Sequence, residues 1–372
     1  MNILLSNSTD IFAGGEDYVF TLARHLAKRG HHIWVSSHPG HLLLRKCEAV
    51  GVDTVPIAYT GMSRVFGVAG ELRRELRRRS IQIIHSNANY DRTCAAIAAA
   101  FSPVRHIATV HSAHSIQHNL THYLRNRFGT AHFIAVAEAV RTVLVEEDNI
   151  DVSRITVIPP GVENDEEDFI ARAREKTRAE LEVAPGTIVI GNVARLVPFK
   201  GHKYLLQAIA ELVRARNNVL FPILGDGELM DDLKEQATGL GIDKYVRFMG
   251  FRDNLNEFYP AFDIYCHSSI ELAEEASPIA ILRALATRLP VVSTKVGGIG
   301  MMVIDGVSGF LTKPEDPRAF AEALLRVMNN KDLRLSMGKA SFHLFLKKFQ
   351  ASAMAEQVEH IYAQVIKAQT PH

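Results

Sequence analysis

Short runs of β-branched and apolar residues alternate along the chain with segments whose apolar positions recur every three to four residues. This alternation is typical of parallel β-sheets covered by helices. In the first helical segment Val19, Leu22, Ala23 and Leu26 fall on one face, and Gly30 is placed to end the helix. In the first half, strands are predicted at residues 2–6, 32–36, 82–86, 106–110, 132–136 and 155–158.

The second half repeats the same alternation, with helices expected from His202 and Glu228. Its strands are predicted at residues 187–194, 219–224, 245–249, 262–267 and 290–294. The pattern therefore predicts an α/β protein of two doubly wound, Rossmann-like domains whose switch points face a shared cleft.

We expect one domain over residues 1–165 and a second over 166–349, joined by the acidic, turn-prone stretch 159–168. The last helical stretch, 351–367, has no strand after it. We expect this C-terminal segment, about residues 350–372, to pack back onto the first domain.

Composition supports a globular protein and adds few constraints. The 372 residues are 47% hydrophobic and 22% charged with a net charge of +1, so nothing demands a nucleic-acid partner. Three cysteines without metal-ligand spacing fit a reducing compartment. The N-terminus lacks the form of a signal peptide, and no apolar run approaches the roughly 20 residues of a membrane span. These features predict a cytoplasmic protein whose membrane contact, if any, is peripheral.

Two glycines, Gly14 and Gly15, stand in a predicted loop between the first strand and the first helix. Paired glycines let a backbone turn sharply and approach a ligand, and a helix N-terminus offers free N–H groups to an anion. A tight turn without a ligand is an equal interpretation. The dinucleotide fingerprint is excluded because no third glycine follows at the required spacing.

A stronger signal opens the second half, GNVARLVPFKGHKYLLQAIA from Gly191. Arg195 and Lys200 follow a buried strand and precede a helix, so both are expected over the carboxyl end of the sheet. Two fixed cations there suit a diphosphate leaving group, whose charge grows as a glycosidic bond breaks. The alternative is a pair of solvated loop cations.

That segment, followed by LGDGE, VRFMGF and PVVSTKVGG, resembles the family-four retaining glycosyltransferases (glycosyltransferase group 1) of the GT-B fold. The Gly14-Gly15 loop, the segment at His111 and ITVIPPGVE agree with it in the first half. The resemblance implies that Arg195 and Lys200 bind the donor diphosphate. It also implies that Gly14 and Gly15 lie against the phosphates and that His111 lies near the transferred sugar.

The family usually carries two glutamates eight positions apart, the first contacting the donor sugar and the second the ribose. Glu275 matches the first, but Arg283 occupies the second, and neither Glu271 nor Glu274 restores the spacing. Gly300 and Met301 also depart from the usual proline and glutamate. The donor-binding residues that the resemblance implies are Gly14, Gly15, Arg195, Lys200, Gly250, Glu275, Ser277, Ile279, Ala280 and Arg283.

Arg283 replaces an acceptor of ribose O–H bonds by a pure donor. A lost charged hydrogen bond is worth roughly 1.5–3 kcal/mol, or about one to two decades in donor affinity. The sequence therefore suggests that nucleotide handling is altered or impaired.

A histidine run follows His111, with His114, His118 and His122 at helical spacing. Such a face could bind zinc, but no carboxylate accompanies it and no HExxH motif is present. A solvated or acceptor-facing helix is the preferred interpretation, and we expect no metal site. For His111 itself, a satisfied core histidine is the alternative.

Residues 71–79, ELRRELRRR, carry five arginines against two glutamates. Near an anionic bilayer each cation can contribute about 1 kcal/mol. A solvated helix face is slightly preferred, although Arg125 and Arg127 beside the histidine run make a peripheral membrane contact plausible.

Together these features predict a retaining, metal-independent glycosyltransferase with Glu275, Arg195, Lys200 and His111 at its catalytic site. It would use a nucleoside-diphosphate sugar, UDP-linked by preference, as co-substrate, with no separate cofactor. The acceptor would be a saccharide, a lipid-linked or a small molecule, in cell-envelope polysaccharide or glycolipid synthesis. The alternatives are a catalytically impaired GT-B binding partner and a sugar-nucleotide epimerase.

Overall fold

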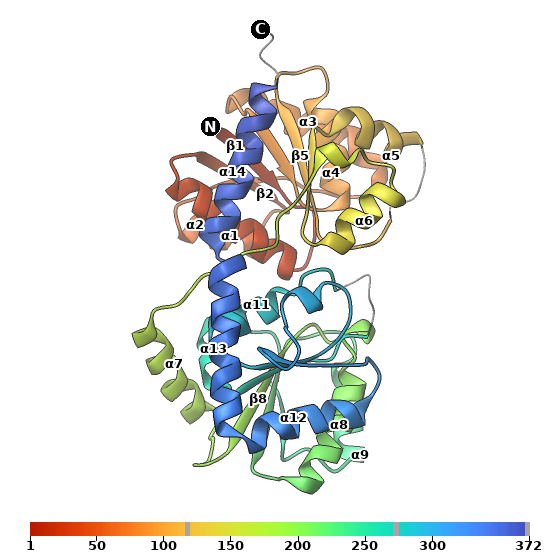
Figure 1. Ribbon diagram of the computed structural model, residues 1–372. Coiled ribbons are helices and arrows are strands. Elements are labelled where there is room, and N and C mark those ends of the chain that lie inside the picture. The colour runs from red at the N-terminus through yellow and green to blue at the C-terminus, as the bar shows by residue number, and fades with distance from the viewer. Residues whose placement is uncertain (116–119, 271–274, 369–372) are drawn as a thin grey trace. The chain divides into compact units, whose positions relative to one another are not determined.

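The computed structural model describes residues 1–115, 120–270 and 275–368, and the chain forms two compact units (Figure 1). The first unit comprises Met1–Gly161 together with Ala351–His372, and the second comprises Val162–Gln350. The chain therefore passes into the second unit after Gly161 and returns to the first at Ala351.

The first unit is built on a parallel seven-stranded sheet of order β3-β2-β1-β4-β5-β6-β7. From β1 the chain adds strands on one side of the sheet, and from β4 it adds them on the other side. The position between β1 and β4 is therefore the switch point of a doubly wound sheet, where ligands usually bind at the carboxyl ends of the strands. The strands are β1 (Asn2–Ser6), β2 (His32–Ser37), β3 (Asp53–Pro56), β4 (Ile83–Ser86), β5 (Arg105–Val110), β6 (His132–Ala135) and β7 (Ile155–Val157).

Both faces of this sheet are covered. Leu4 and Ile84 pack with α3 and α4 in one apolar core, whereas the next residue, His85, hydrogen-bonds Tyr362 of α14. Successive strand residues point to opposite faces, so α14 lies on the face opposite to α3 and α4. The helices are α1 (Gly14–Lys28), α2 (Leu42–Ala49), α3 (Val65–Arg78), α4 (Asn89–Ala99), α5 (Leu120–Leu124), α6 (Glu138–Glu146) and α14 (Ala351–Lys367), with the π-helix η2 (Arg125–Gly129).

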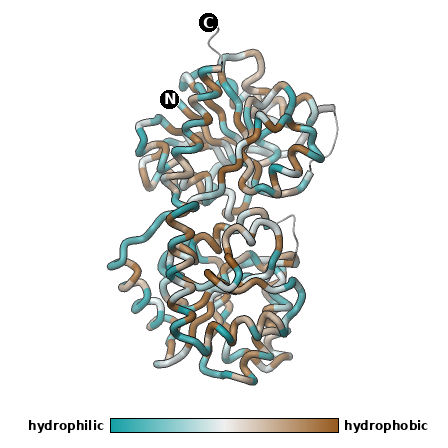
Figure 2. Tube along the Cα trace, viewed as in Figure 1, coloured by the Kyte–Doolittle hydropathy of each residue, from teal (hydrophilic) through white to brown (hydrophobic). Residues whose placement is uncertain are grey.

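The second unit has a parallel six-stranded sheet of order β10-β9-β8-β11-β12-β13. Its four central strands are almost wholly buried, as expected for a parallel sheet with helices on both faces. The strands of the sheet are β8 (Ile188–Val193), β9 (Val219–Leu224), β10 (Val246–Phe248), β11 (Ile264–His267), β12 (Val291–Thr294) and β13 (Gly309–Thr312). Figure 2 shows apolar residues running along the strands inside each unit.

Helices α8 and α12 pack together over one core of this unit, and α11 packs against α13. The helices are α7 (Glu167–Glu180), α8 (His202–Ala215), α9 (Met230–Gly239), α10 (Leu255–Phe258), α11 (Ile279–Ala286), α12 (Pro317–Asn329) and α13 (Lys331–Lys348). Short 3₁₀ turns include η4 (Pro198–Lys200) and η6 (Ile299–Met301).

The predicted fold class, two Rossmann-like parallel-sheet domains, is confirmed. Two strands, β3 and β13, were not predicted because both are four-residue edge strands with a single buried hydrophobic side chain each, Val55 and Phe310. The other strands fall within one or two residues of the predicted bounds, and α9 begins at Met230 rather than Glu228.

No helix in the described part of the chain is both long and apolar enough to cross a membrane.

Candidate active site

Arg195 and Lys200 are carried by the segment that leaves β8 at the carboxyl edge of the second sheet. The backbone of this segment is fixed by two hydrogen bonds to the neighbouring loop, Ala194 N to Leu224 O at 3.0 Å and Leu196 N to Asp226 O at 2.9 Å. Gly225 makes this approach possible, because a Cβ atom there would lie 1.9 Å from the Ala194 carbonyl oxygen. The LGDGE motif thus positions the cationic segment.

Both cations lie over the same aromatic ring. The Arg195 guanidinium is 5.6 Å and the Lys200 ammonium 5.1 Å from the centroid of Phe199. Cations over an aromatic face are held by the ring's quadrupole. Arg195 is exposed while the Lys200 side chain is only 14% exposed. The arrangement gives one cation accessible to solvent and one held inside the unit.

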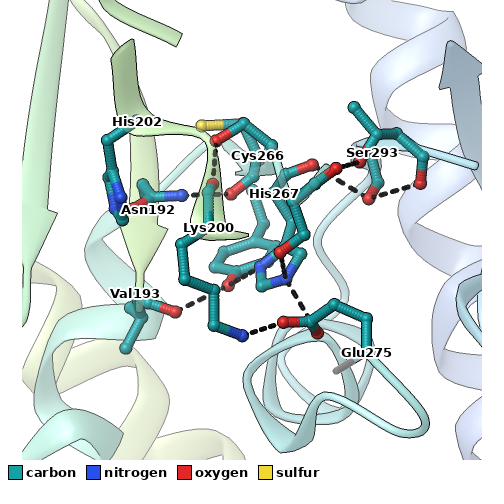
Figure 3. Close-up of polar contacts among 12 residues, drawn as sticks. Asn192, Val193, Lys200, His202, Cys266, His267, Glu275 and Ser293 are labelled. Carbon is teal, nitrogen blue, oxygen red and sulfur yellow. Dashed lines mark hydrogen bonds and ion pairs between the residues drawn. The ribbon is translucent and has the colours of Figure 1, made fainter. Parts of the chain in front are cut away.

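Glu275 is the buried partner of Lys200. The Lys200 ammonium donates to Glu275 Oε1, and Glu275 Oε2 lies 3.3 Å from His267 Nε2 (Figure 3). The Glu275 side chain is 1% exposed. Lys200 and Glu275, both singled out from the sequence, are therefore in direct contact. His267, which the sequence analysis did not single out, contacts the same carboxylate.

Electrostatics decide the charge states in this cluster. Burial alone raises the pKa of Glu275, but Lys200 and His267 outweigh it and lower the pKa to about 2. Burial lowers the pKa of His267, although Glu275 opposes this shift. The result is a carboxylate paired with an ammonium at neutral pH. Because a carboxylate only accepts, His267 Nε2 donates toward it.

Behind His267 a chain of polar groups runs through the unit. Its Nε2 also lies 3.1 Å from Ser269 Oγ, and its Nδ1 lies 3.3 Å from the Tyr265 hydroxyl. His202 Nε2 meets Asn192 Oδ1 at 3.1 Å, and the Asn192 amide donates to the Cys266 carbonyl at 2.9 Å (Figure 3). Polar residues inside otherwise apolar strands were the available sequence signal for this network.

The glycine after Lys200 is required by its surroundings. Gly201 has φ +66°, and a Cβ atom there would lie 2.2 Å from the carbonyl oxygen of Ser268. Ser268 Oγ in turn donates to the Lys200 carbonyl at 2.9 Å. The turn between η4 and α8 therefore packs directly on the end of β11, which brings Lys200 to Glu275.

Four of the expected donor-binding residues lie at or just before the N-terminus of α11. Ile279 and Ala280 open this helix, and Pro278 at its N-cap provides no side-chain cap. Ser277 Oγ is buried and has no hydrogen-bond partner among the described residues. The Glu275 carbonyl accepts from Gly298 N at 2.8 Å, which ties this segment to the PVVSTKVGG motif. The backbone N–H groups of such a helix start favour an anion.

Arg283 lies on α11 and is half-buried. Burial raises the pKa of Asp165, and the charge of Arg283 opposes this shift, so the two groups are close enough to interact. Arg283 thus has a local electrostatic partner in the same unit.

Gly250 follows β10 with φ +67°, and its carbonyl accepts from Gly225 N at 2.9 Å. Gly300 and Met301 lie in η6.

In the first unit, Gly14 and Gly15 were predicted to lie in a loop, but they form the first turn of α1. Neither has a positive φ, so their value is not a sharp turn. A Cβ atom at Gly15 would meet only Asn7 Nδ2, at 4.0 Å. The helix start is capped by Glu16, whose Oε2 accepts from Ala13 N at 2.7 Å.

His111 follows β5 at the carboxyl edge of the first sheet. Its ring packs edge-on against Tyr18 at 4.9 Å. Burial and the nearby charge of Arg92 lower its pKa to about 4, so the ring is neutral at neutral pH. Its Nε2 is buried without a hydrogen-bond partner among the described residues, which argues against a satisfied core histidine.

Of the other histidines in the predicted run, two lie in the described part of the chain and they do not share a helix. His114 lies in an irregular segment, His122 lies on α5, and His118 lies outside the described residues. Glu271 and Glu274 also lie outside them. No group of three or more potential metal ligands occurs in the part of the chain that was described.

The basic segment forms the C-terminal part of α3, as expected. Arg73 donates to the carbonyls of Ala98 and Ala100, and Arg79 pairs with Glu75. Arg74, Arg77 and Arg78 are exposed, as is Arg127. Arg125, in contrast, is 5% exposed and cannot serve a membrane contact as the sequence had suggested.

Comparison with known proteins relates both units to glycosyltransferases. Residues 12–166 match the family Glycosyltransferase Family 4, and residues 173–343 match the family Glycosyl transferases group 1. The chain is 30% identical over 241 residues to the D-inositol 3-phosphate glycosyltransferase of Corynebacterium efficiens, covering 61% of this chain and 54% of that protein. It thus spans about half the length of such curated relatives.

The UDP-Gal:alpha-D-GlcNAc-diphosphoundecaprenol alpha-1,3-galactosyltransferase of Escherichia coli is 28% identical over 244 residues, which are 64% of this chain and 61% of that one. The crystal structure of Anabaena HepE in complex with UDP and glucose superimposes with a TM-score of 0.83 at 20% identity, covering 97% of this chain and 99% of that one. At this identity the likeness establishes the fold. The chain belongs to the glycosyltransferases that join a Family 4 domain to a group 1 domain.

Proposed function

We propose that this protein transfers a sugar from a nucleoside diphosphate sugar to an acceptor hydroxyl. The observation that carries the proposal is the pairing of Lys200 with buried Glu275, beside Arg195, at the carboxyl edge of the second sheet. Cations fixed at that edge suit a diphosphate, and a buried carboxylate suits hydroxyl groups of a sugar. The cluster brings both chemistries to one place.

Each residue has a distinct role in this reaction. Arg195 and Lys200 bind the diphosphate and stabilise its growing charge as the glycosidic bond breaks. Glu275 accepts hydrogen bonds from the sugar, and its pairing with Lys200 keeps it ionised. The free N–H groups at the start of α11 add electrostatic support. Neutral His111 positions the sugar as a hydrogen-bonding group.

We propose transfer with retention of anomeric configuration, in which charge stabilisation by these residues replaces a divalent ion and no separate cofactor takes part. A uridine nucleotide is the preferred donor, because the Escherichia coli relative is named for UDP-Gal and Anabaena HepE was crystallised with UDP. A saccharide, a lipid-linked or a small-molecule acceptor in cell-envelope polysaccharide or glycolipid synthesis fits the diphosphoundecaprenol acceptor in the name of the Escherichia coli relative.

The proposal is tested by UDP binding and by release of UDP from UDP-sugars offered with candidate acceptors. Arg195→Gln removes an exposed cation and should weaken UDP binding by about tenfold or more, as for a lost charged hydrogen bond. Lys200→Met in a Glu275→Gln background should weaken it similarly without leaving a buried charge unpaired.

Lys203→Met, an exposed lysine on α8, is the matched control and should bind UDP as the unaltered chain does. Equal affinity in all four proteins contradicts the assigned diphosphate site. UDP release without a glycosylated product points instead to the epimerase alternative.

A second candidate function, a catalytically impaired binding partner, is favoured by Arg283. If Arg283 impairs ribose binding, Arg283→Glu should raise UDP affinity by about one to two decades. The new carboxylate would face Asp165, so the double variant Arg283→Glu, Asp165→Asn removes that repulsion. Unchanged or weaker binding in both variants contradicts an impaired ribose site.

For localisation, we propose a cytoplasmic protein that contacts the inner membrane face through the exposed arginines of α3. Co-sedimentation with vesicles containing anionic lipid should then fall on substitution of Arg74, Arg77 and Arg78 by glutamine. Co-sedimentation that does not depend on anionic lipid contradicts the contact.

A further inference from the structure

Two arginines are buried in the first unit, away from the cluster around Glu275. Arg92 lies in the first turn of α4, directly after β4, and Arg125 opens η2 just before β6. Each is 5% exposed. Arginines are almost never buried to this extent unless they are paired.

These guanidinium groups are only partly satisfied by the residues around them. Arg125 donates to Asn89 Oδ1 and Thr93 Oγ1, both at 2.9 Å, but its second terminal nitrogen is buried with no partner among the described residues. Arg92 Nε is likewise buried and unpartnered within that part of the chain. At least two strong N–H donors are therefore left over.

The nearest carboxylate does not absorb them. Asp91 accepts from Ser6 and Ser8 hydroxyls at 2.8 and 2.9 Å and from two backbone N–H groups at 3.0 Å. Its four acceptor positions are thus occupied by neutral donors. Asp148 contributes a second negative charge that acts on both arginines, and it accepts from Ser115 Oγ at 2.8 Å.

A third unsatisfied group belongs to the same region. His111 Nε2 is buried without a partner among the described residues, and Arg92 is close enough to affect the pKa of this histidine. Arg92 likewise affects the pKa of Arg125, and Arg125 contacts Asn89 and Thr93, which flank Arg92 on the same helix. A neutral imidazole can donate one N–H, which adds to the donors of the two guanidinium groups.

An unpartnered buried donor costs about 1–3 kcal/mol, and more for a charged one. Two adjacent guanidinium groups also repel each other. One oxyanion would satisfy these donors together, because phosphate and carboxylate match the fork geometry of arginine. Arg92 and His111 follow β4 and β5, at the carboxyl edge of a doubly wound sheet where ligands bind. Arg125 reaches the start of α4 through its contacts with Asn89 and Thr93.

We propose that Arg92, Arg125 and His111 form a binding site for an oxyanionic group, a phosphate or a carboxylate, on the acceptor. That the oxyanion belongs to an acceptor rests on the proposed transferase function. Arg92 and Arg125 hold its charge, and His111 Nε2 donates to it or to an adjacent oxygen.

The experiment is calorimetric titration of the full chain with inorganic phosphate, glycerol 3-phosphate, glucuronate and glycerol. We expect the three anions to bind and glycerol not to bind. The higher affinity of the two, glycerol 3-phosphate or glucuronate, identifies the acceptor's charged group as a phosphate or a carboxylate. Arg92→Gln should weaken anion binding by about tenfold or more. Arg45→Gln, an exposed arginine on α2, is the matched control and should leave it unchanged.

Asn89→Asp is a second test variant, for the case that Arg92→Gln does not fold. It places a carboxylate against the Arg125 nitrogen that Asn89 Oδ1 already contacts, on an exposed residue where an acidic group also suits the helix start. It should therefore fold and weaken anion binding by about tenfold or more.

Anion affinity that is unchanged in Asn89→Asp and lost in Arg195→Gln overturns the proposal, because the anion would then occupy the second unit. That result would show Arg125 to be only a structural link between η2 and α4. UDP binding should be the same in Arg92→Gln and Asn89→Asp. If the unaltered chain binds the anions but not UDP, the result contradicts the proposed function and leaves the anion site standing.

Discussion

Glu275 is a carboxylate held in the interior of a unit by one ammonium and one imidazole. Removing one partner of a buried ion pair usually costs about 3–5 kcal/mol, because the other charge is left uncompensated. The same pairing keeps Glu275 ionised without a ligand, because Lys200 and His267 hold its pKa at about 2. A sugar nucleotide that binds can share Lys200 with Glu275, since an ammonium group carries three N–H groups that donate hydrogen bonds.

This pairing predicts a specific acid sensitivity. The pKa of Glu275 is about 2 in the folded chain against 4.5 ordinarily, so the unfolded chain takes up the proton first. The pair therefore contributes to the free energy of unfolding above about pH 4.5, and the contribution is lost as the pH falls toward 2.

Urea unfolding between about pH 6 and pH 3 checks this prediction. The free energy of unfolding should fall more steeply with decreasing pH in the unaltered chain than in Glu275→Gln, which has no proton to gain there. Parallel slopes for the two proteins contradict an ionised, paired Glu275.

At the scale of elements, the turn from η4 into α8 decides where Lys200 lies. The sequence placed Lys200 after a strand and before a helix, which is correct. It could not show that Gly201 packs on the backbone of Ser268, because that contact joins residues far apart in the chain. The close approach of two backbones, rather than the turn alone, brings the ammonium to the carboxylate.

Gly201→Ala should destabilise the chain through both strain and a clash with the Ser268 carbonyl. Gly186→Ala is the matched control, since Gly186 has φ +79° but nothing within 4 Å of an added Cβ. The left-handed conformation alone costs about 1–2 kcal/mol. Chemical denaturation should show a clearly larger loss for Gly201→Ala, accompanied by weaker UDP binding. Equal losses would mean that the backbone contact does not constrain the turn.

At the scale of the molecule, the chain ends in the unit where it began. Helix α14 packs on α1, and Glu359 pairs with Arg29 at 2.5 Å and with His31 at 2.7 Å. Deeper in the same unit Tyr362 contacts His85 Nδ1 at 2.6 Å, while His85 Nε2 meets Thr109 at 2.7 Å. The last helix therefore completes the core and polar interior of the first unit.

Tyr362→Phe keeps the ring and removes only the hydroxyl, which leaves His85 Nδ1 buried without a partner. Burial lowers the pKa of His85 to about 3, so the neutral ring cannot escape this cost by protonation at neutral pH. The free energy of unfolding should fall by about 1–3 kcal/mol. Tyr123→Phe, on an exposed tyrosine, should change it by less than about 0.5 kcal/mol. Equal stabilities for the two variants would show that the contact contributes nothing.

Most of the fold was predictable because parallel strands and their covering helices leave a local record in the periodicity of apolar residues. Strands β3 and β13 left no such record, since each has only one buried hydrophobic side chain among its four residues. The paired glycines were predicted as a turn although they begin α1, because glycine composition does not separate a flexible turn from the first turn of a helix. Arg125 was read as a surface charge because sequence does not reveal burial.

The sequence by itself determined the two-domain α/β architecture, the positions of Arg195 and Lys200 after a strand, and the departure at Arg283. These follow from local spacing, which is fixed along the chain. Only the tertiary structure decided that Lys200 and Glu275 are paired, that His267 joins them, and that Arg92 and Arg125 lie buried with donors unsatisfied. Burial and contacts between distant segments are set by how sheets and helices pack, and no local pattern encodes which charges that packing brings together.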